Sequence, residues 1–148
     1  MFPNAKGSEL LAILATLDPS SQAAGTATTG WIPAHAHHAL LAVVQTGVLG
    51  TGATVDAKVQ QALDATGTGV KDITGKAIVQ IAKASGDNKQ ALINVSPQEL
   101  DTVGGFGFIR LSVTVAGAAS LTAAQVLGIN ARELPADGAN QASVVQVV

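Results

Sequence analysis

The sequence FIRLSVTVA, residues 108–116, is the strongest evidence for the fold class of this chain. Apolar and polar side chains alternate along it from Ile109 to Val115. Successive side chains of a β-strand point to opposite faces of the sheet, so this alternation predicts a strand with one buried face and one solvent-facing face. The buried set is predicted to be Ile109, Leu111, Val113 and Val115.

Similar alternation recurs in two other stretches, residues 54–63 and residues 89–95. In the first, Gln61 is the one polar residue on the apolar side, and Leu63 ends that side. Both stretches predict half-buried strands. Together with residues 108–116 they predict a two-sheet core built from Val55, Val59, Ile93, Ile109, Leu111, Val113 and Val115.

Other runs are apolar on both sides, of which residues 39–48 are the clearest and predict a buried strand. Residues 76–82 and 121–131 give weaker signals. The alanine-rich start of the latter fits a helix by propensity, whereas the regular spacing of strands and turns favours another strand. Turns are predicted by Gly, Pro, Ser, Asp and Asn at residues 18–21, 50–52, 67–69, 85–88 and 104–105.

Strands separated by turns of this kind predict an all-β fold, a single antiparallel β-sandwich of the jelly-roll or Ig-like type with extended terminal arms. We place the sandwich, including an N-terminal strand, at residues 1–132 and an extended C-terminal arm at residues 133–148. The apolar run at residues 10–17 lacks a basic start and is too short to span a membrane, so we expect it to belong to the fold. Residues 20–32 are predicted to form an edge segment.

The composition points to a subunit of an assembly. Of the 148 residues only 12% are charged, and the net charge is -2. Neutral side chains must therefore cover much of the surface, which does little to repel neighbouring subunits. The eight Lys and Arg residues are scattered, which argues against nucleic-acid binding, and the absence of cysteine excludes disulfides, thiol catalysis and Cys-based metal sites.

Three histidines, His35, His37 and His38, form the one conspicuous cluster of titratable residues. On a strand, His35 and His37 would share a face and His38 would lie opposite. A firm metal site needs a third ligand and supporting hydrogen bonds, and no Asp or Glu is near. We therefore expect a polar surface or a subunit contact and no metal, although an oligomer axis could bring symmetry-related histidines together.

No arrangement of residues predicts an enzyme or a cofactor site. The carboxylates fall mainly at expected turns, where Asp caps the backbone. The loop Gly67-Thr68-Gly69 lacks the Lys-Ser/Thr ending of a phosphate-binding loop, and no serine has a nucleophile-elbow pattern.

Apolar residues beside chain breakers are the candidate interface residues. The final valines could instead form a last edge strand of the chain's own sheet, and the sequence leaves both interpretations open. The candidates are Phe2, Trp31, Leu134, Val144, Val145, Val147 and Val148.

Four segments resemble small virion proteins of tailed bacteriophages, some of which are similar to capsid decoration, or cement, proteins. They are GTGATVDAKVQ at residues 50–60, DITGKAI at 72–78, NKQALINV at 88–95 and FIRL at 108–111. The resemblance extends over about residues 10–132. The chain departs from it at Phe108, where the family often has Tyr, and at the histidine cluster, where charged and aromatic residues are usual.

This resemblance implies a capsid-surface protein of the virion that binds the major capsid protein and stabilises the head by bridging its subunits. It also implies a homo-oligomer, with a trimer favoured, and no nucleic-acid or membrane partner. A head–tail connector or tail component is the alternative within the same class. A host- or carbohydrate-binding module is the alternative of another class, although the chain has no Tyr and a single Trp for stacking on sugars.

Overall fold

The computed structural model describes residues 4–148, so the interface candidate Phe2 lies outside the described residues. Half of the chain lies in strands, arranged in two antiparallel sheets. One sheet has the order β1 (Leu11–Gln22), β10 (Ser120–Ala131), β4 (His37–Thr46) and β8 (Gln90–Val95). The other has the order β2 (Gly25–Thr28), β9 (Phe108–Ala116), β5 (Thr54–Ala62) and β6 (Lys71–Ala77).

Short elements complete the second sheet and the connections. Strand β3 (Ile32–Pro33) pairs with β9, and β7 (Ile81–Ala82) pairs with β5. The helical turns are α1 (Gly7–Leu10), α2 (Lys83–Gly86), η1 (Ala34–Ala36), η2 (Pro97–Glu99) and η3 (Ala136–Ala139).

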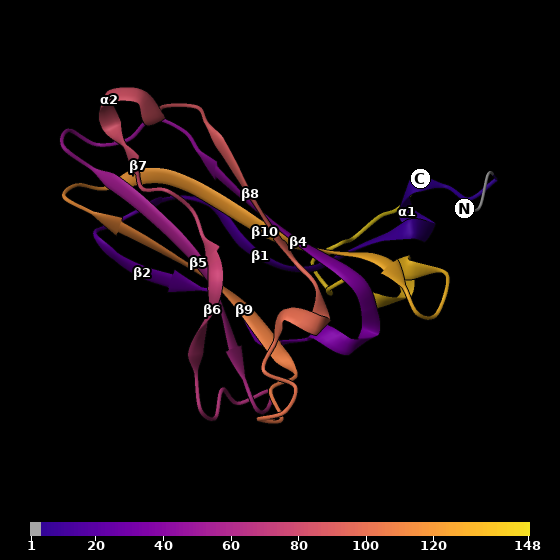
Figure 1. The fold of residues 1–148 in the computed structure, drawn as a ribbon. Coiled ribbons are helices and arrows are strands. Elements are labelled where there is room, and N and C mark those ends of the chain that lie inside the picture. Colours follow the sequence, from indigo (N-terminus) through magenta and orange to yellow (C-terminus); the bar gives the residue numbers. More distant parts are fainter. Residues whose placement is uncertain (1–3) are drawn as a thin grey trace.

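The chain crosses repeatedly between the two sheets, which lie one over the other in Figure 1. Strands β1, β4, β8 and β10 belong to one sheet, and the strands that come between them in sequence belong to the other. Apart from the two-residue strands β3 and β7, the eight remaining strands lie four to a sheet, and their order is that of a jelly roll. The all-β prediction is therefore confirmed, and the topology is the jelly-roll type rather than the Ig-like type.

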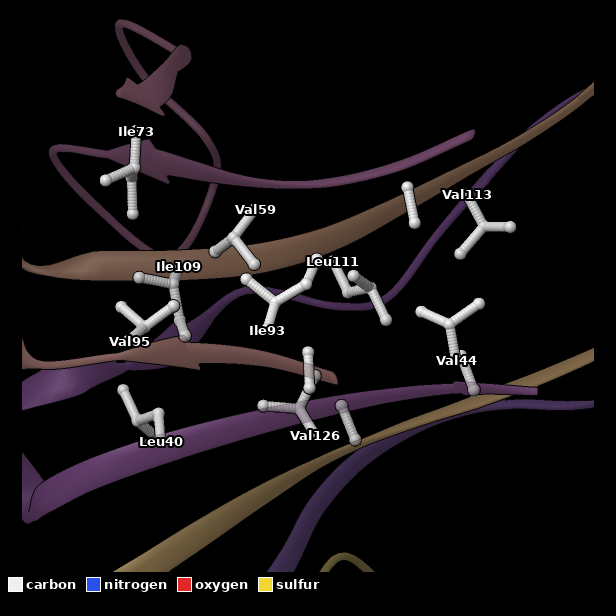
Figure 2. Close-up of a cluster of buried hydrophobic side chains, with 14 of the residues drawn as sticks. Leu40, Val44, Val59, Ile73, Ile93, Val95, Ile109, Leu111, Val113 and Val126 are labelled. Carbon is white, nitrogen blue, oxygen red and sulfur yellow. The ribbon is translucent and has the colours of Figure 1, made fainter. Parts of the chain in front are cut away.

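The core lies between the two sheets, as the facing side chains of Figure 2 show. Leu40, Val44 and Val126 come from the first sheet and pack against residues such as Leu111 and Val113 of the second. Every residue of the predicted core set is at most 5% exposed, so this prediction is confirmed. Gln61 also faces inward, as its position predicts, and its side-chain carbonyl accepts a hydrogen bond of 2.8 Å from the backbone N–H of Asp101.

The predicted strands at residues 54–63, 89–95 and 108–116 correspond to β5, β8 and β9, and residues 39–48 overlap β4. The alanine-rich run at residues 121–131 is a strand, β10, because it pairs on both sides with β1 and β4. Residues 20–32 include β2, which lies at the edge of its sheet, as predicted.

Three local predictions are wrong. Residues 18–21 form no turn, because β1 continues through them with a register shift between Leu17 and Ser20 that takes Pro19 out of the ladder of this edge strand. Residues 76–82 form no continuous strand: they hold the end of β6 and all of β7, which are separated by residues 78–80 and pair with different parts of β5. Leu63 lies beyond the end of β5 and is 40% exposed.

Candidate interaction surface

The outward side of the sheet β1-β10-β4-β8 is covered by aliphatic side chains. The strand register places Ile13, Leu127 and Leu41 in one row across β1, β10 and β4. Leu92 extends the surface onto β8, where it pairs with Val43 and is 60% exposed. We call this surface the apolar face, and it consists of Leu11, Ile13, Ala39, Leu41, Val43, Leu92, Ala123, Leu127 and Ile129.

The polar positions of the apolar face are neutral. Among the described residues, those interspersed with the aliphatic side chains are Thr16, Gln45, Gln90, Asn94 and Gln125, and none of them is charged. At the border, Asp18 at the β1 register shift accepts a hydrogen bond of 3.2 Å from the Thr16 hydroxyl.

The outward side of the opposite sheet is polar and its side chains bond to one another. Lys58 and Asp72 form an ion pair of 2.8 Å, and Arg110 Nε donates to Gln60 Oε1 at 3.0 Å. The two outer surfaces of the sandwich therefore differ in kind: one suits water and the other suits a protein partner.

A depression of about 440 Å³ lies at one end of the apolar face. Ala123, Leu121 and Gln45 contribute to its lining, and Leu121 is 46% exposed. The apolar face is therefore hollowed at this end.

The C-terminal region begins against the edge of β1. Ile13 N–H donates to Asn140 Oδ1 at 2.7 Å, and Gln141 N–H donates to the Ile13 carbonyl at 2.8 Å. Ala136 is 1% exposed, within a turn that contacts β1 and α1. Residues 136–141 thus occupy hydrogen-bonding positions at the edge of β1.

Beyond Gln141 the chain exposes apolar side chains. Val145 is 92% exposed, Val147 is 50% exposed and Val148 is fully exposed, whereas Val144 is half-buried. Leu134, at the start of the C-terminal region, is 45% exposed. Of the candidate interface residues at this end, all but Val144 are therefore exposed.

Trp31, the remaining candidate, is half-buried at the end of the sandwich where the loop of residues 63–70 lies. The Arg110 guanidinium lies 4.7 Å from the centre of the Trp31 ring, close enough for a cation–π interaction. A Cβ at Gly67 would overlap the indole nitrogen, so this glycine permits the close approach of loop and ring.

The histidines do not share a strand face, which corrects the prediction. His35 lies in the turn η1, which follows Pro33, and β4 begins only at His37. His37 is 1% exposed, so it is neither a surface residue nor a free contact group. Its ring packs on Gly128 of β10, where any side chain would overlap it, and burial lowers the pKa of His37. His38 is exposed.

A cavity of about 550 Å³ lies beside these histidines, lined in part by His35, His37, Arg132 and Glu133. Arg132 Nε donates to the His35 carbonyl at 2.6 Å, which ties the end of β10 to the turn η1. Residues 4–148 contain no group of three side chains placed to hold a metal ion. None of their helices is long and apolar enough to cross a membrane.

Several carboxylates cap turns, as predicted. Asp64 accepts hydrogen bonds from the backbone N–H groups of Thr66 and Thr68, and hydrogen bonds from these two threonines hold its pKa well below the usual range. Asp87 similarly accepts from the backbone N–H of Leu49 at 2.9 Å. These carboxylates shape loops.

Comparison with known proteins gives neither a family model nor a curated protein that matches this chain. Solved structures do resemble it. A Broad Bean Stain Virus chain matches at 11% identity and a TM-score of 0.40, over 76% of this chain and 61% of that chain. A chain of the Cowpea mosaic virus top component matches at 10% identity and a TM-score of 0.44, over 87% and 88%.

The xylan-binding module CBM15 matches to a similar degree, at 9% identity and a TM-score of 0.43, over 87% of this chain and 96% of that chain. The chain spans less than two thirds of the Broad Bean Stain Virus protein. All three likenesses concern the fold alone, and proteins of different function share it.

Proposed function

We propose that this chain is a structural protein of a virion that binds the outside of a bacteriophage capsid and stabilises the head by bridging capsid subunits. The exposed valines at the C-terminal end carry the proposal, because Val145 and Val148 offer apolar contact to a partner protein. The apolar face supports membership of an assembly, because a sheet surface with neutral polar positions is suited to burial against protein. The four segments that resemble virion proteins of tailed phages suggest that this chain is part of a virion. The proposal includes no catalytic step.

The physical effect of such binding follows from mass action. A protein that binds assembled capsid subunits, and not separated ones, adds its binding free energy to the stability of the lattice. A lattice offers the same site many times, so one small chain can reinforce a whole shell. The resemblance suggests three copies around an axis, and the apolar face supports self-association.

We assign the contact with the major capsid protein to residues 142–148. Val145 and Val148 are exposed there, next to a segment that is already held on the edge of β1. An extended apolar segment can join the sheet edge of another protein, gaining backbone hydrogen bonds while alternate side chains fill pockets. The hydrogen bonds of Asn140 and Gln141 to Ile13 would hold the bound segment to the sandwich.

The test is binding of the purified chain to particles stripped of it. Replacing Val145, Val147 and Val148 together by Thr keeps the side-chain shape and removes apolar contact, so it is expected to reduce the amount bound. Val103 is 99% exposed in a loop far from this segment in sequence, and Val103→Thr is the matched control, expected to bind like wild type. Full binding by the triple variant would refute the assignment of this segment.

Copy number separates capsid decoration from the head–tail connector. A decorating chain repeats over the shell in proportion to the major capsid protein, whereas a connector forms one ring. Quantitative mass spectrometry of purified particles measures this ratio. A ratio that corresponds to a single ring would replace the proposal by the connector.

A further inference from the structure

The C-terminal region covers the edge of β1 but leaves the middle of the apolar face uncovered. The C-terminal region occupies the β1 edge through Asn140 and Gln141, which blocks pairing of a further strand at Ile13. Strands β10 and β4 lie in the middle of the sheet and present Leu127 and Leu41 outward. An occupant must therefore lie on the face of the sheet rather than extend it at this edge.

The chemistry of the face selects the occupant. Leu41 and Leu127 lie at its centre, and the side chains around them are aliphatic, hydroxyl or amide groups. A strongly charged partner surface would lose its hydration here and find no opposite charge. A second copy of this chain brings the same neutral surface, which meets itself without like-charge repulsion.

We infer that the apolar face packs against the apolar face of a second copy. This inference deepens the proposed function, on which it rests, by naming what covers the face. Contact between identical surfaces is isologous and closes at two copies. It therefore gives a dimer in solution rather than the three copies that the resemblance suggests.

The extent of the face meets what a specific dimer needs. The four strands range from six residues in β8 to twelve in β1 and β10 and average ten residues. At about 4.8 Å between strands and about 3.3 Å per residue, they make a surface of roughly 600 Å². Two such surfaces bury about 1,200 Å² in total, which is the lower end of specific protein interfaces. Sheets pack face to face in this way about 10 Å apart, with side chains interdigitating.

The test is the mass of the purified full chain in solution, measured by light scattering and sedimentation over a wide range of concentration. Wild type is expected to approach the mass of a dimer as concentration rises. Leu41→Lys and Leu127→Lys place charges at the centre of the contact and are expected to stay at the monomer mass. Thr26→Lys, at an exposed position of β2 on the opposite sheet, is the matched control and is expected to dimerise like wild type.

Circular dichroism establishes that each variant retains its strands. If a central lysine prevents folding, Leu92→Lys provides the second variant, because Leu92 is 60% exposed on an edge strand and its substitution leaves the core intact. It is expected to weaken the dimer. Two results would overturn the inference: a wild type that is monomeric at every concentration, or an oligomer that the lysine variants leave unchanged.

The mass of the chain in solution and its presence on particles test the dimer and the capsid role separately. A monomeric wild type that still coats particles would overturn the face-to-face dimer and leave the capsid role standing. A dimer that responds to the lysine variants, in a chain absent from particles, would establish the contact and refute the capsid role.

Discussion

Replacing Leu111 with Ala tests the two-sheet core at its centre. Leu111 is on β9, has no exposed surface, and lies in the cluster where the two sheets meet (Figure 2). Truncation removes buried methyl groups and leaves a cavity, which together cost about 2–5 kcal/mol in the interior of a protein. Since neighbours from both sheets hold the site open, we expect a loss in the upper half of this range. Urea unfolding measures it, as a lower midpoint with an unchanged slope.

Leu92→Ala is the matched control for this experiment. It makes the same chemical change on β8, at a side chain that points outward and is 60% exposed. At concentrations where the chain is monomeric, we expect a loss well below 1 kcal/mol. Equal losses for the two variants, or a larger loss for Leu92→Ala, would refute the assignment of faces on which both the core and the apolar face depend.

Three further predictions concern His37 and the C-terminal region. Gly128→Ala is expected to lower the free energy of unfolding by about 1–3 kcal/mol, because its methyl group would overlap the His37 ring. The same substitution in a His37→Ala variant is expected to cost less, and equal losses in urea unfolding of the two backgrounds would show that the contact does not matter. Burial lowers the pKa of His37 from 6.5, so the folded state binds fewer protons than the unfolded state and stability falls as pH drops below about 6.5. His37→Leu is expected to remove this loss of stability at low pH. If thermal unfolding of the variant still shows the loss, another group causes it. Deleting residues 142–148 is expected to leave stability unchanged, whereas deleting residues 136–148 costs about 3 kcal/mol through three lost hydrogen bonds to β1; equal stability would mean that the docked turn contributes nothing.

Alternation was sufficient to predict β5 and β9, the two central strands of one sheet, and β8 at the edge of the other. Residues such as Val55, Val59 and Leu111 alternate with hydrophilic side chains, because the outward side of their sheet meets water. The same rule says less about β4 and β10, whose outward sides carry Leu41 and Leu127. An apolar run of this kind predicts a strand buried on both faces, and the sequence alone does not show that one of the faces is open.

The local errors arise from interactions that a single segment does not reveal. Asp18-Pro19 is a common turn pair, yet here it forms an irregularity in an edge strand because β10 pairs with residues on both sides of it. Spacing placed the histidines on one strand, whereas η1 separates His35 from β4. The burial of His37 depends on Gly128, distant in sequence, whose missing side chain provides the space for the ring.

A three-dimensional reconstruction of the native particle tests the capsid role most directly. We expect this jelly roll on the outer surface of the shell, repeated in proportion to the major capsid protein. We also expect a second copy to cover the apolar face and residues 142–148 to contact the capsid. A shell without this chain would refute the capsid role, and an apolar face open to solvent at every copy would refute the face-to-face dimer.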